Sequence, residues 1–226
     1  MARSIIVTGG FGILGQAVSE AFAGVGDKVA RIDFAPGPAK AVAGALDIGG
    51  VDLGDAAATQ GALNAAAAAH GGLDVLVNIA GGFTWETLED GSIETWSRMQ
   101  AMNLLSNVTI TKLALPLLKA SDAGRIVNIG AGAAIKAGMG MGAYTASKSG
   151  VHRLTEALAE ELADSSVTVN AVLPSVIDTP ANRADMPDAD PTGWVQPAAL
   201  AEVILFLASP AARAISGALI PVTRGG

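Results

Sequence analysis

Tyr144 and Lys148 lie four residues apart at the start of a long helical pattern, and their types and spacing could do acid–base chemistry. On a helix this spacing places the two side chains on one face, one turn apart. An ammonium group near a phenol favours the phenolate, so we expect Lys148 to lower the pKa of Tyr144 from its usual value of ~10. The pair could then exchange protons near neutral pH. An isolated pair of this kind is usually an ordinary surface pair, so its meaning depends on the rest of the chain.

A glycine-rich turn at residues 8–15 joins an expected strand to an expected helix. Glycines there let the backbone approach a pyrophosphate, and the N-terminus of the helix offers free N–H groups and a positive dipole end. Asp33 ends the next expected strand, where a carboxylate can accept hydrogen bonds from ribose hydroxyls and repel a 2′-phosphate. Phe34, rather than a cation, follows it. The pattern predicts a dinucleotide cofactor, with NADH favoured over NADPH.

Composition limits the partners and the cell compartment. Half of the 226 residues are hydrophobic, which allows a sizeable core, and the net charge of −7 argues against a nucleic-acid partner. The chain has no cysteine and two histidines, so we expect no metal site. Residues 1–8 lead directly into a strand, which predicts no signal peptide, and the apolar stretch 104–118 is interrupted by polar residues. We therefore expect a cytoplasmic protein with no membrane partner.

Short β-rich runs alternate with alanine- and leucine-rich helical stretches along the whole chain. Expected strands lie at 4–8, 28–33, 50–53, 75–79, 125–130, 168–173 and 219–222, and expected helices at 15–25, 59–70, 94–118, 144–162 and 198–208. Several strands are continuous apolar runs, as in a parallel sheet that helices cover on both faces. The alternation predicts an α/β fold, a single Rossmann-type doubly wound sheet over residues 1–226. The proline-rich stretch 174–197 is expected to be a lid loop on the substrate side.

Further motifs stand in order along the chain. Asp52-Leu53 resembles an adenine-contacting pair, and residues 78–81 (Asn-Ile-Ala-Gly) are similar to an Asn-Asn-Ala-Gly motif. Asn103 matches a helix asparagine, and residues 174–179 are similar to a segment that meets the nicotinamide carboxamide. With the glycine-rich turn and the Tyr144 motif, they make the chain similar to the short-chain dehydrogenase/reductase family over essentially its whole length.

The resemblance implies roles for individual residues. It makes Tyr144, Lys148 and Asn103 the catalytic group, with Asn103 holding a water of a proton relay. The cofactor-binding residues that it implies are Gly9, Phe11, Gly12, Ile13, Leu14, Gly15, Asp33, Asp52, Leu53, Asn78, Ala80, Gly81, Tyr144, Lys148, Pro174, Ile177 and Thr179. It also implies a homodimer or homotetramer, assembled through the helices at 94–118 and 144–162.

One departure from the family pattern bears on the substrate. The family's catalytic serine would lie thirteen residues before Tyr144, where this chain has Ala131. The dihydropteridine reductase-like branch lacks that serine in the same way, and residues 138–154 and 171–194 resemble it further. The resemblance implies NADH-dependent reduction of a small electron-poor quinonoid or imine acceptor, such as a dihydropterin. Candidate substrate-lining residues are Ala131, Met139, Arg183 and Trp194.

Two other functions remain open from the sequence. The chain could be an ordinary carbonyl reductase or alcohol dehydrogenase of the short-chain family, with water or a backbone N–H in place of the serine. It could also be an NAD-binding regulator without catalysis. The presence of Tyr144, Lys148 and Asn103 together argues against the regulator, because a regulator needs no proton donor.

Overall fold

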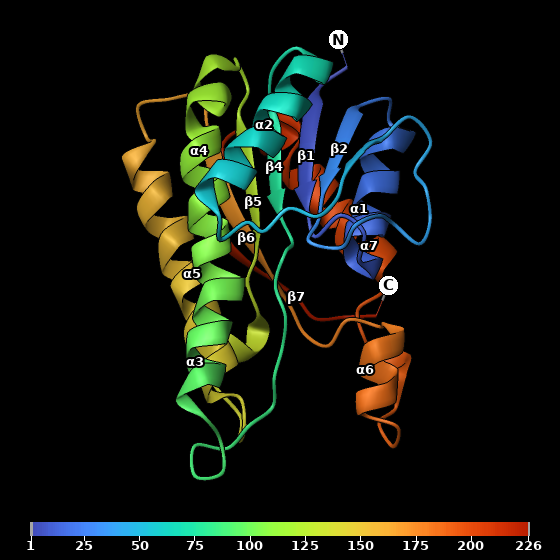
Figure 1. Cartoon of the computed structure of the whole chain (residues 1–226), viewed down its shortest axis with the longest axis vertical. Helices are drawn as coiled ribbons and strands as arrows, with labels where there is room; N and C mark the ends of the chain where they lie inside the picture. Colours follow the sequence, from blue (N-terminus) through green and yellow to red (C-terminus); the bar gives the residue numbers. More distant parts are fainter. Residues whose placement is uncertain (1, 226) are drawn as a thin grey trace.

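The computed structural model describes residues 2–225, and these form one seven-stranded parallel sheet in the order β3-β2-β1-β4-β5-β6-β7 (Figure 1). The strands are β1 (Ser4–Thr8), β2 (Lys28–Ile32), β3 (Leu46–Ile48), β4 (Val75–Asn78), β5 (Arg125–Ile129), β6 (Thr168–Pro174) and β7 (Leu219–Val222). The chain leaves β3 at one edge and returns to pair β4 with β1, so the strand order reverses there. A doubly wound sheet binds its ligand at the carboxyl ends of the strands beside such a reversal. The predicted fold class is confirmed.

Helices cover both faces of the sheet. They are α1 (Ile13–Gly24), α2 (Ala56–His70), α3 (Ile93–Met99), α4 (Ser106–Ala120), α5 (Gly142–Glu161), α6 (Pro180–Asp185) and α7 (Pro197–Leu207). One buried cluster joins α2, α4 and α5 to the sheet, and a second joins α1 and α7 to the opposite face (Figure 1). In β1, Ile6 belongs to the first cluster and Ile5 and Val7 to the second. This alternation across the pleat explains why the strand reads as a continuous apolar run.

The third strand differs from the sequence prediction. It covers Leu46–Ile48, and residues 50–53 form a loop instead of the expected strand. Gly50 has a φ of +73°, which ends the extended backbone. Val51 and Leu53 are apolar because they fill the core from the loop, where they are 7% and 6% exposed. The apolar alternation of this segment therefore marks burial and not strand pairing.

The expected helix at 94–118 is a composite. A π-helical turn, Gln100–Leu105, lies between α3 and α4. The whole stretch Ile93–Ala120 is long and apolar enough, by length and composition alone, to cross a membrane. Its α4 part nevertheless lies against the sheet, and Ile110, Ala114 and Leu118 are fully buried there. The α4 part thus packs as a core helix, while Ile93, Met102 and Leu105 earlier in the stretch are exposed.

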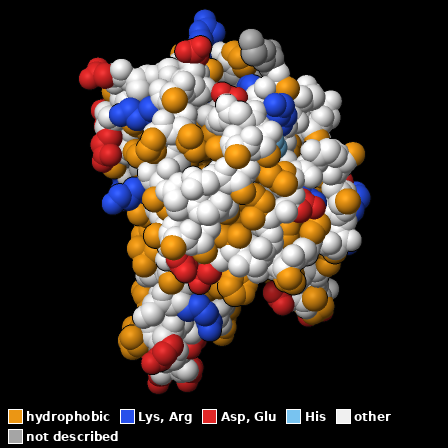
Figure 2. Space-filling model, turned by 45° about the horizontal axis from the view of Figure 1, so that its top comes forward, with side chains coloured by type: hydrophobic (Ala, Val, Ile, Leu, Met, Phe, Trp, Pro, Cys, Tyr) orange, Lys and Arg blue, Asp and Glu red, His pale blue; other side chains and the backbone are white. Residues whose placement is uncertain are grey.

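Two arms extend past the carboxyl edge of the sheet (Figure 1). One consists of α3 with the loop before it, and the other is built on residues 174–197. The second arm contains α6, a 3₁₀ turn at Pro191–Gly193 and a bridge between Ile177 and Val195, so it is more ordered than the lid loop that the sequence predicts. Figure 2 shows hydrophobic side chains around the hollow between the arms. The hollow gives a small molecule a route to the strand ends.

Candidate active site

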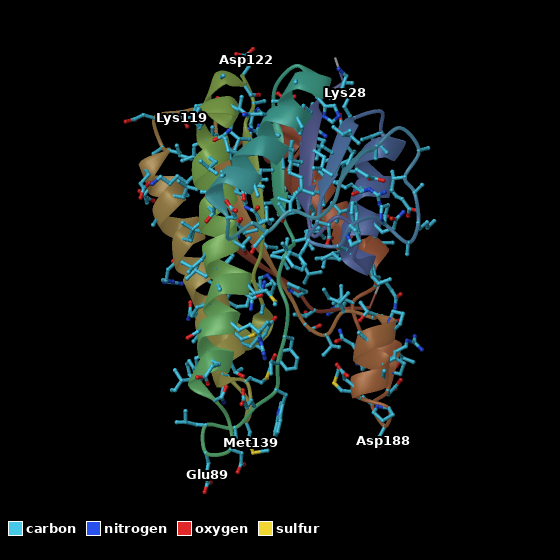
Figure 3. All side chains as sticks on the ribbon, viewed as in Figure 1. Lys28, Glu89, Lys119, Asp122, Met139 and Asp188 are labelled. Atoms are coloured by element: carbon cyan, nitrogen blue, oxygen red, sulfur yellow. The ribbon has the colours of Figure 1, made fainter. Side chains whose placement is uncertain are left out.

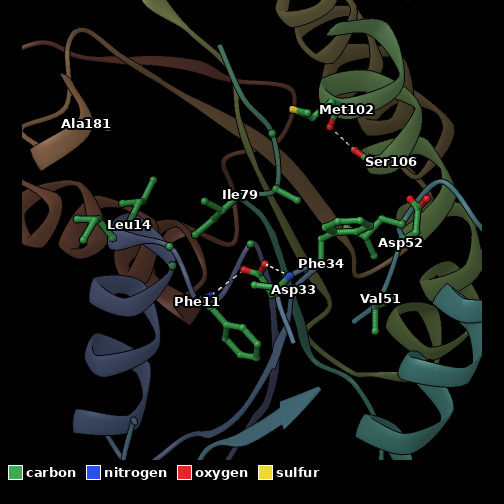
Figure 4. A pocket seen from close by; sticks show the side chains of 18 of the residues that line it. Phe11, Leu14, Asp33, Phe34, Val51, Asp52, Ile79, Met102, Ser106 and Ala181 are labelled. Atoms are coloured by element: carbon green, nitrogen blue, oxygen red, sulfur yellow. Dashed lines mark hydrogen bonds between the residues drawn. The ribbon is translucent and has the colours of Figure 1, made fainter. Parts of the chain in front are cut away.

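A cavity of about 1140 Å³ lies at the carboxyl ends of β1, β2 and β4 (Figure 4). Its walls come from the turn after β1, the segment after β2, the loop after β3 and the residues that follow β4. Twelve of the predicted cofactor residues line it: Gly9, Phe11, Gly12, Ile13, Leu14, Gly15, Asp33, Asp52, Leu53, Ala80, Gly81 and Thr179. The structure therefore brings together residues that the sequence places in five separate segments.

The glycine-rich turn fits a dinucleotide cofactor. Gly9 has a φ of +62°, a conformation that other residues rarely adopt. A Cβ on Gly15 would lie 2.1 Å from the carbonyl oxygen of Gly9, so α1 can begin this close to the turn only with glycine there. The N-terminus of α1 consequently faces the cavity with no side-chain cap, and its free N–H groups suit a pyrophosphate.

Asp33 holds the same turn through its carboxylate. Its Oδ2 accepts a hydrogen bond from the N–H of Phe11 (2.9 Å), and its Oδ1 accepts one from the N–H of Ala35 (3.0 Å; Figure 4). Each carboxylate oxygen has a second lone pair, so both stay available to ribose hydroxyls. The dinucleotide-binding pattern places an acidic residue at this point against the ribose 2′-OH.

The other five predicted cofactor residues lie outside the cavity walls: Asn78, Tyr144, Lys148, Pro174 and Ile177. Asn78 points into the interior, where its Nδ2 donates to Asn107, Thr111 and Asn128 (3.2, 3.0 and 2.9 Å). Its side chain therefore joins α4 to the sheet rather than facing the cavity. Pro174 ends β6, and Ile177 forms the bridge inside the second arm.

Tyr144 lies in the first turn of α5 and is half-buried. Its ring meets the ring of Phe83 edge to face, with centroids 4.9 Å apart. Burial raises the pKa of Tyr144 to about 12. The expectation that Lys148 lowers this pKa is therefore wrong for the protein by itself, because the phenolate loses water on burial and Nζ of Lys148 is directed to the carbonyl oxygen of Ile129. Tyr144 is a protonated phenol at neutral pH, which suits a proton donor.

Lys148 is buried one turn further along α5. Its Nζ donates a hydrogen bond to the carbonyl oxygen of Ile129 at the end of β5 (2.8 Å). Burial lowers the pKa of Lys148 to about 8. Its ammonium thus loses its proton more readily than that of a solvated lysine. This places an adjustable positive charge beside Gly81 of the cavity wall, where a Cβ on that glycine would lie 3.5 Å from Nζ.

Asn103 lies in the π-helical turn and is 1% exposed. Its Nδ2 donates to the carbonyl oxygen of Gly82 (3.1 Å) and to Oγ of Ser147 (3.0 Å), while its Oδ1 accepts from the N–H of Gly82 (2.8 Å). Asn103 therefore links the segment after β4 to the helix of Tyr144. The sequence predicts only a packing role for Ser147 on the tyrosine helix. Its hydroxyl in fact accepts this hydrogen bond and so helps to fix Asn103.

Ala131 follows β5 and is 4% exposed. Its N–H donates to Nε2 of His152 on α5 (3.3 Å), and a Cβ on Gly130 would lie 2.6 Å from the same nitrogen. Burial is the main reason why the pKa of His152 falls below its usual value, so the ring is neutral and can accept this hydrogen bond. The segment in place of the family's serine thus has small residues that lie against a histidine.

None of the four candidate substrate-lining residues lies in the cavity walls, Ala131 included. Met139 is 80% exposed in the loop before α5, where the next residue, Gly140, accepts a hydrogen bond from the N–H of Glu86 on the first arm (Figure 3). Arg183 pairs with Asp178 through Nε and Nη2 (2.5 and 2.8 Å), so its charge is already neutralised. Trp194 is buried within the second arm. The sequence analysis also missed Ile79, although it lies within the motif at 78–81. The other missed wall residues carry no motif because they are mostly ordinary apolar or small side chains: Phe34, Ala35, Gly37, Ala39, Val51, Gly54, Ala101, Met102, Ser106, Pro180 and Ala181.

Comparison with known proteins decides the family. The family model described as short chain dehydrogenase matches residues 3–190. The chain belongs to this family. A 2,5-dichloro-2,5-cyclohexadiene-1,4-diol dehydrogenase of Sphingobium indicum is 34% identical, with 97% of this chain and 94% of the relative covered. A D-beta-hydroxybutyrate dehydrogenase of Cupriavidus necator is 32% identical, with 96% and 95% covered.

A solved structure of a reductase shares this fold. The 3-ketoacyl-(acyl-carrier-protein) reductase from Brucella melitensis, solved in complex with NADH, superimposes with a TM-score of 0.85 at 27% identity. The match covers 97% of this chain and 96% of that one. The chain is therefore an NAD(P)-dependent short-chain oxidoreductase. The relatives above are dehydrogenases of a diol and a hydroxy acid, so they lend no particular support to the dihydropteridine reductase-like branch.

Proposed function

We propose that this oxidoreductase prefers NADH and reduces a flat, electron-poor ring compound, a quinonoid or imine acceptor of the dihydropterin kind. One observation carries the proposal. Residues 130–134, where the family has its serine, carry no hydroxyl, and the hydroxyls at the start of α5 are all committed. Thr145 donates to Met141, Ser147 to Tyr144 and Ser149 to Ala134, each to a backbone carbonyl oxygen. Apart from the hydroxyl of Tyr144, residues 130–134 and the start of α5 therefore offer a substrate oxygen no free hydroxyl donor.

The residues present suit an acceptor that needs little polarisation. When bound, the nicotinamide cofactor supplies a hydride. Tyr144, protonated at neutral pH, donates a proton to the acceptor. Lys148 provides positive charge near the cofactor, and Asn103 fixes the segment after β4 against α5. A quinonoid or imine ring supplies its own driving force, because reduction relieves its cross-conjugation.

Aromatic side chains beside Tyr144 support a ring-shaped substrate. Phe83 presents half of its surface to solvent while its edge meets the tyrosine ring. Trp85 lies against Gly140, where a Cβ would be 2.2 Å from the indole. These flat surfaces lie on the arm that faces the hollow, where they can stack on a planar substrate.

A second candidate function comes from the relatives. A dehydrogenase of cyclic diols or hydroxy acids would use the same residues in the oxidising direction, and the diol relative from Sphingobium indicum favours it. In that direction Tyr144 must accept a proton as phenolate. Its raised pKa leaves little phenolate at neutral pH, and residues 130–134 carry no hydroxyl to hold an alcohol, so we place reduction of a flat acceptor first.

Ala131→Ser tests the two candidates. If the native acceptor is quinonoid, the new hydroxyl has nothing to polarise, and we expect its reduction to stay unchanged or to slow as the flat wall becomes crowded. If the protein is instead a dehydrogenase of diols or hydroxy acids, the reverse reaction, reduction of the product ketone, should rise by roughly 10²–10³-fold, the effect of one well-placed donor. Turnover of NADH with a panel of quinonoid, imine and ketone acceptors measures both.

Ala133→Ser is the matched control, because it adds a hydroxyl to the same segment away from residue 131. Ala133→Ser should leave the turnover of NADH with every acceptor unchanged. A wild-type protein that reduces simple ketones well and ignores quinonoid dihydropterins would contradict the proposed acceptor, while the family assignment would stand.

Asp33→Ala tests the cofactor preference. Without the carboxylate, repulsion of a 2′-phosphate disappears, and we expect the preference for NADH over NADPH to narrow by at least about tenfold, because like charges in contact are strongly unfavourable. Asp33→Asn keeps an acceptor for the N–H of Phe11, so it separates loss of charge from loosening of the turn. Equal binding of the two cofactors by the wild type would refute this role of Asp33.

A further inference from the structure

Arg31 is the largest of the fully buried side chains, and the acid–base chemistry does not use it. It lies in β2, two residues before Asp33, and is 0% exposed. It is also absent from the cavity walls. Burying a cation is costly unless it is paired and hydrogen-bonded, so its presence in the core calls for a reason.

The guanidinium group is fixed by a bidentate ion pair. Its Nε donates to Oδ1 of Asp47 (2.7 Å) and its Nη2 donates to Oδ2 (2.8 Å), which sets the plane of the group. Nη1 donates to Oε1 of Gln16 on α1 (2.7 Å). One side chain therefore connects β2, β3 and the helix that begins at the cofactor turn.

The same guanidinium supports the cofactor turn from behind the cavity. Its Cζ lies 5.3 Å from the centre of the Phe11 ring, a distance suited to a cation–π contact. A Cβ on Gly10 would lie 2.6 Å from Cβ of Arg31, so the turn rests directly on β2 here. Phe11 is therefore held twice, by its ring on Arg31 and by its N–H on Asp33.

Arg31 also fastens the segment between β2 and β3. Its Nη1 donates to the carbonyl oxygen of Lys40 (3.3 Å), and Nζ of Lys40 pairs with Glu20 on α1 (2.7 Å). Residues Phe34, Ala35, Gly37 and Ala39 of this segment line the cavity. The glycine-rich turn and this segment lie on the two sides of Asp33. Both contact the buried guanidinium group of Arg31.

We propose that Arg31 is a positioning residue for the adenosine half of the cofactor. It acts through Phe11 and the 34–45 segment, which together hold the carboxylate of Asp33 toward the ribose. The inference rests on the dinucleotide cofactor argued above. It predicts that loss of Arg31 weakens cofactor binding without altering the proton chemistry at Tyr144.

Arg31→Met is the first test, with Arg125→Met as the matched control. Arg125 is also buried in a central strand, but it lies at the first residue of β5, and its Nη1 donates to the carbonyl oxygens of Gly124 and Ser166 away from the cavity. We expect Arg31→Met to raise Kd for NADH and for ADP-ribose by the same factor, about tenfold, with kcat at saturating cofactor little changed. Arg125→Met should lower the melting temperature and leave both Kd values unchanged.

Two milder variants keep the test decisive if Arg31→Met does not fold. Arg31→Lys keeps the charge without the bidentate fork, and Asp47→Asn keeps a hydrogen-bonding oxygen while removing the partner charge. Both should raise Kd for ADP-ribose, by less than Arg31→Met. Unchanged Kd values together with a lowered melting temperature in these variants would overturn the proposal and leave Arg31 a purely structural residue.

Repeating the titrations with NADPH separates this proposal from the cofactor preference. A wild type that binds NADPH more tightly than NADH would contradict the preference. A loss of affinity for that tighter cofactor in Arg31→Met would still support the positioning role.

Discussion

Tyr144→Phe should lower the turnover number by roughly 10²–10⁴-fold, the usual contribution of a general acid. Removal of the hydroxyl deletes the proton donor, while the ring and its edge contact with Phe83 stay in place. Because the pKa of Tyr144 is about 12, the wild-type donor is present over the whole neutral range. The loss should therefore appear at every pH from about 6 to about 9, a window that spans the ordinary pKa values of His and Cys.

Steady-state turnover and NADH titration measure this effect. The affinity for NADH should hardly change, since the loss concerns the chemical step. Lys148→Met serves as a comparison, because it removes the charge beside the cofactor and leaves the phenol. It should weaken cofactor binding as well as turnover. An unaltered turnover number in Tyr144→Phe would mean that the proton comes from another group.

Gly15→Ala should abolish tight cofactor binding and lower the free energy of unfolding. The new Cβ would lie 2.1 Å from the carbonyl oxygen of Gly9 and 2.7 Å from Cα of Gly10. Both are backbone atoms, so the steric clash can be relieved only if α1 moves away from the turn. Inserting a methyl group into a well-packed site costs typically ~1–3 kcal/mol, and here the displaced atoms are those that would bind the pyrophosphate.

Gly24→Ala is the matched control, because it lies in the same helix and a Cβ there meets nothing within 4 Å. Urea unfolding and NADH titration of the two variants give the comparison. Gly24→Ala should keep wild-type affinity and be as stable as the wild type or slightly more so. If Gly15→Ala binds NADH normally, then the contact between α1 and the turn does not shape the site.

Much of the fold and half of the site could be predicted from local sequence. Alternating apolar strands and helices determine a doubly wound sheet, and its strand reversal puts the glycine-rich turn, Asp33 and Gly81 at one edge. The prediction of a strand at residues 50–53 is wrong because Val51 and Leu53 are apolar for burial and not for pairing. The cytoplasmic location and the homo-oligomeric assembly remain predictions from the sequence.

The remainder of the site depends on packing between distant segments. The raised pKa of Tyr144 follows from burial, which spacing along a helix does not reveal. Asn78 belongs to a familiar motif, yet its side chain joins an interior network of asparagines and threonines. Arg31 carries no motif, and its role is visible only when Asp47, Gln16 and Phe11 are seen around it.

The π-helical turn makes the site sensitive to chain length. Buried residues recur at every fourth position through Thr95, Met99, Asn103, Asn107 and Thr111. In a regular α-helix such a row would drift by about 160° around the axis, because each residue turns the chain by about 100°. The wider turn at Gln100–Leu105 takes up part of that drift and keeps Asn103 between the sheet and α5. Adding one residue there would rotate α3 against α4 by about 100°, although every side chain of the catalytic group would still be present. Deleting one would instead let the wide turn close to a regular α-helix.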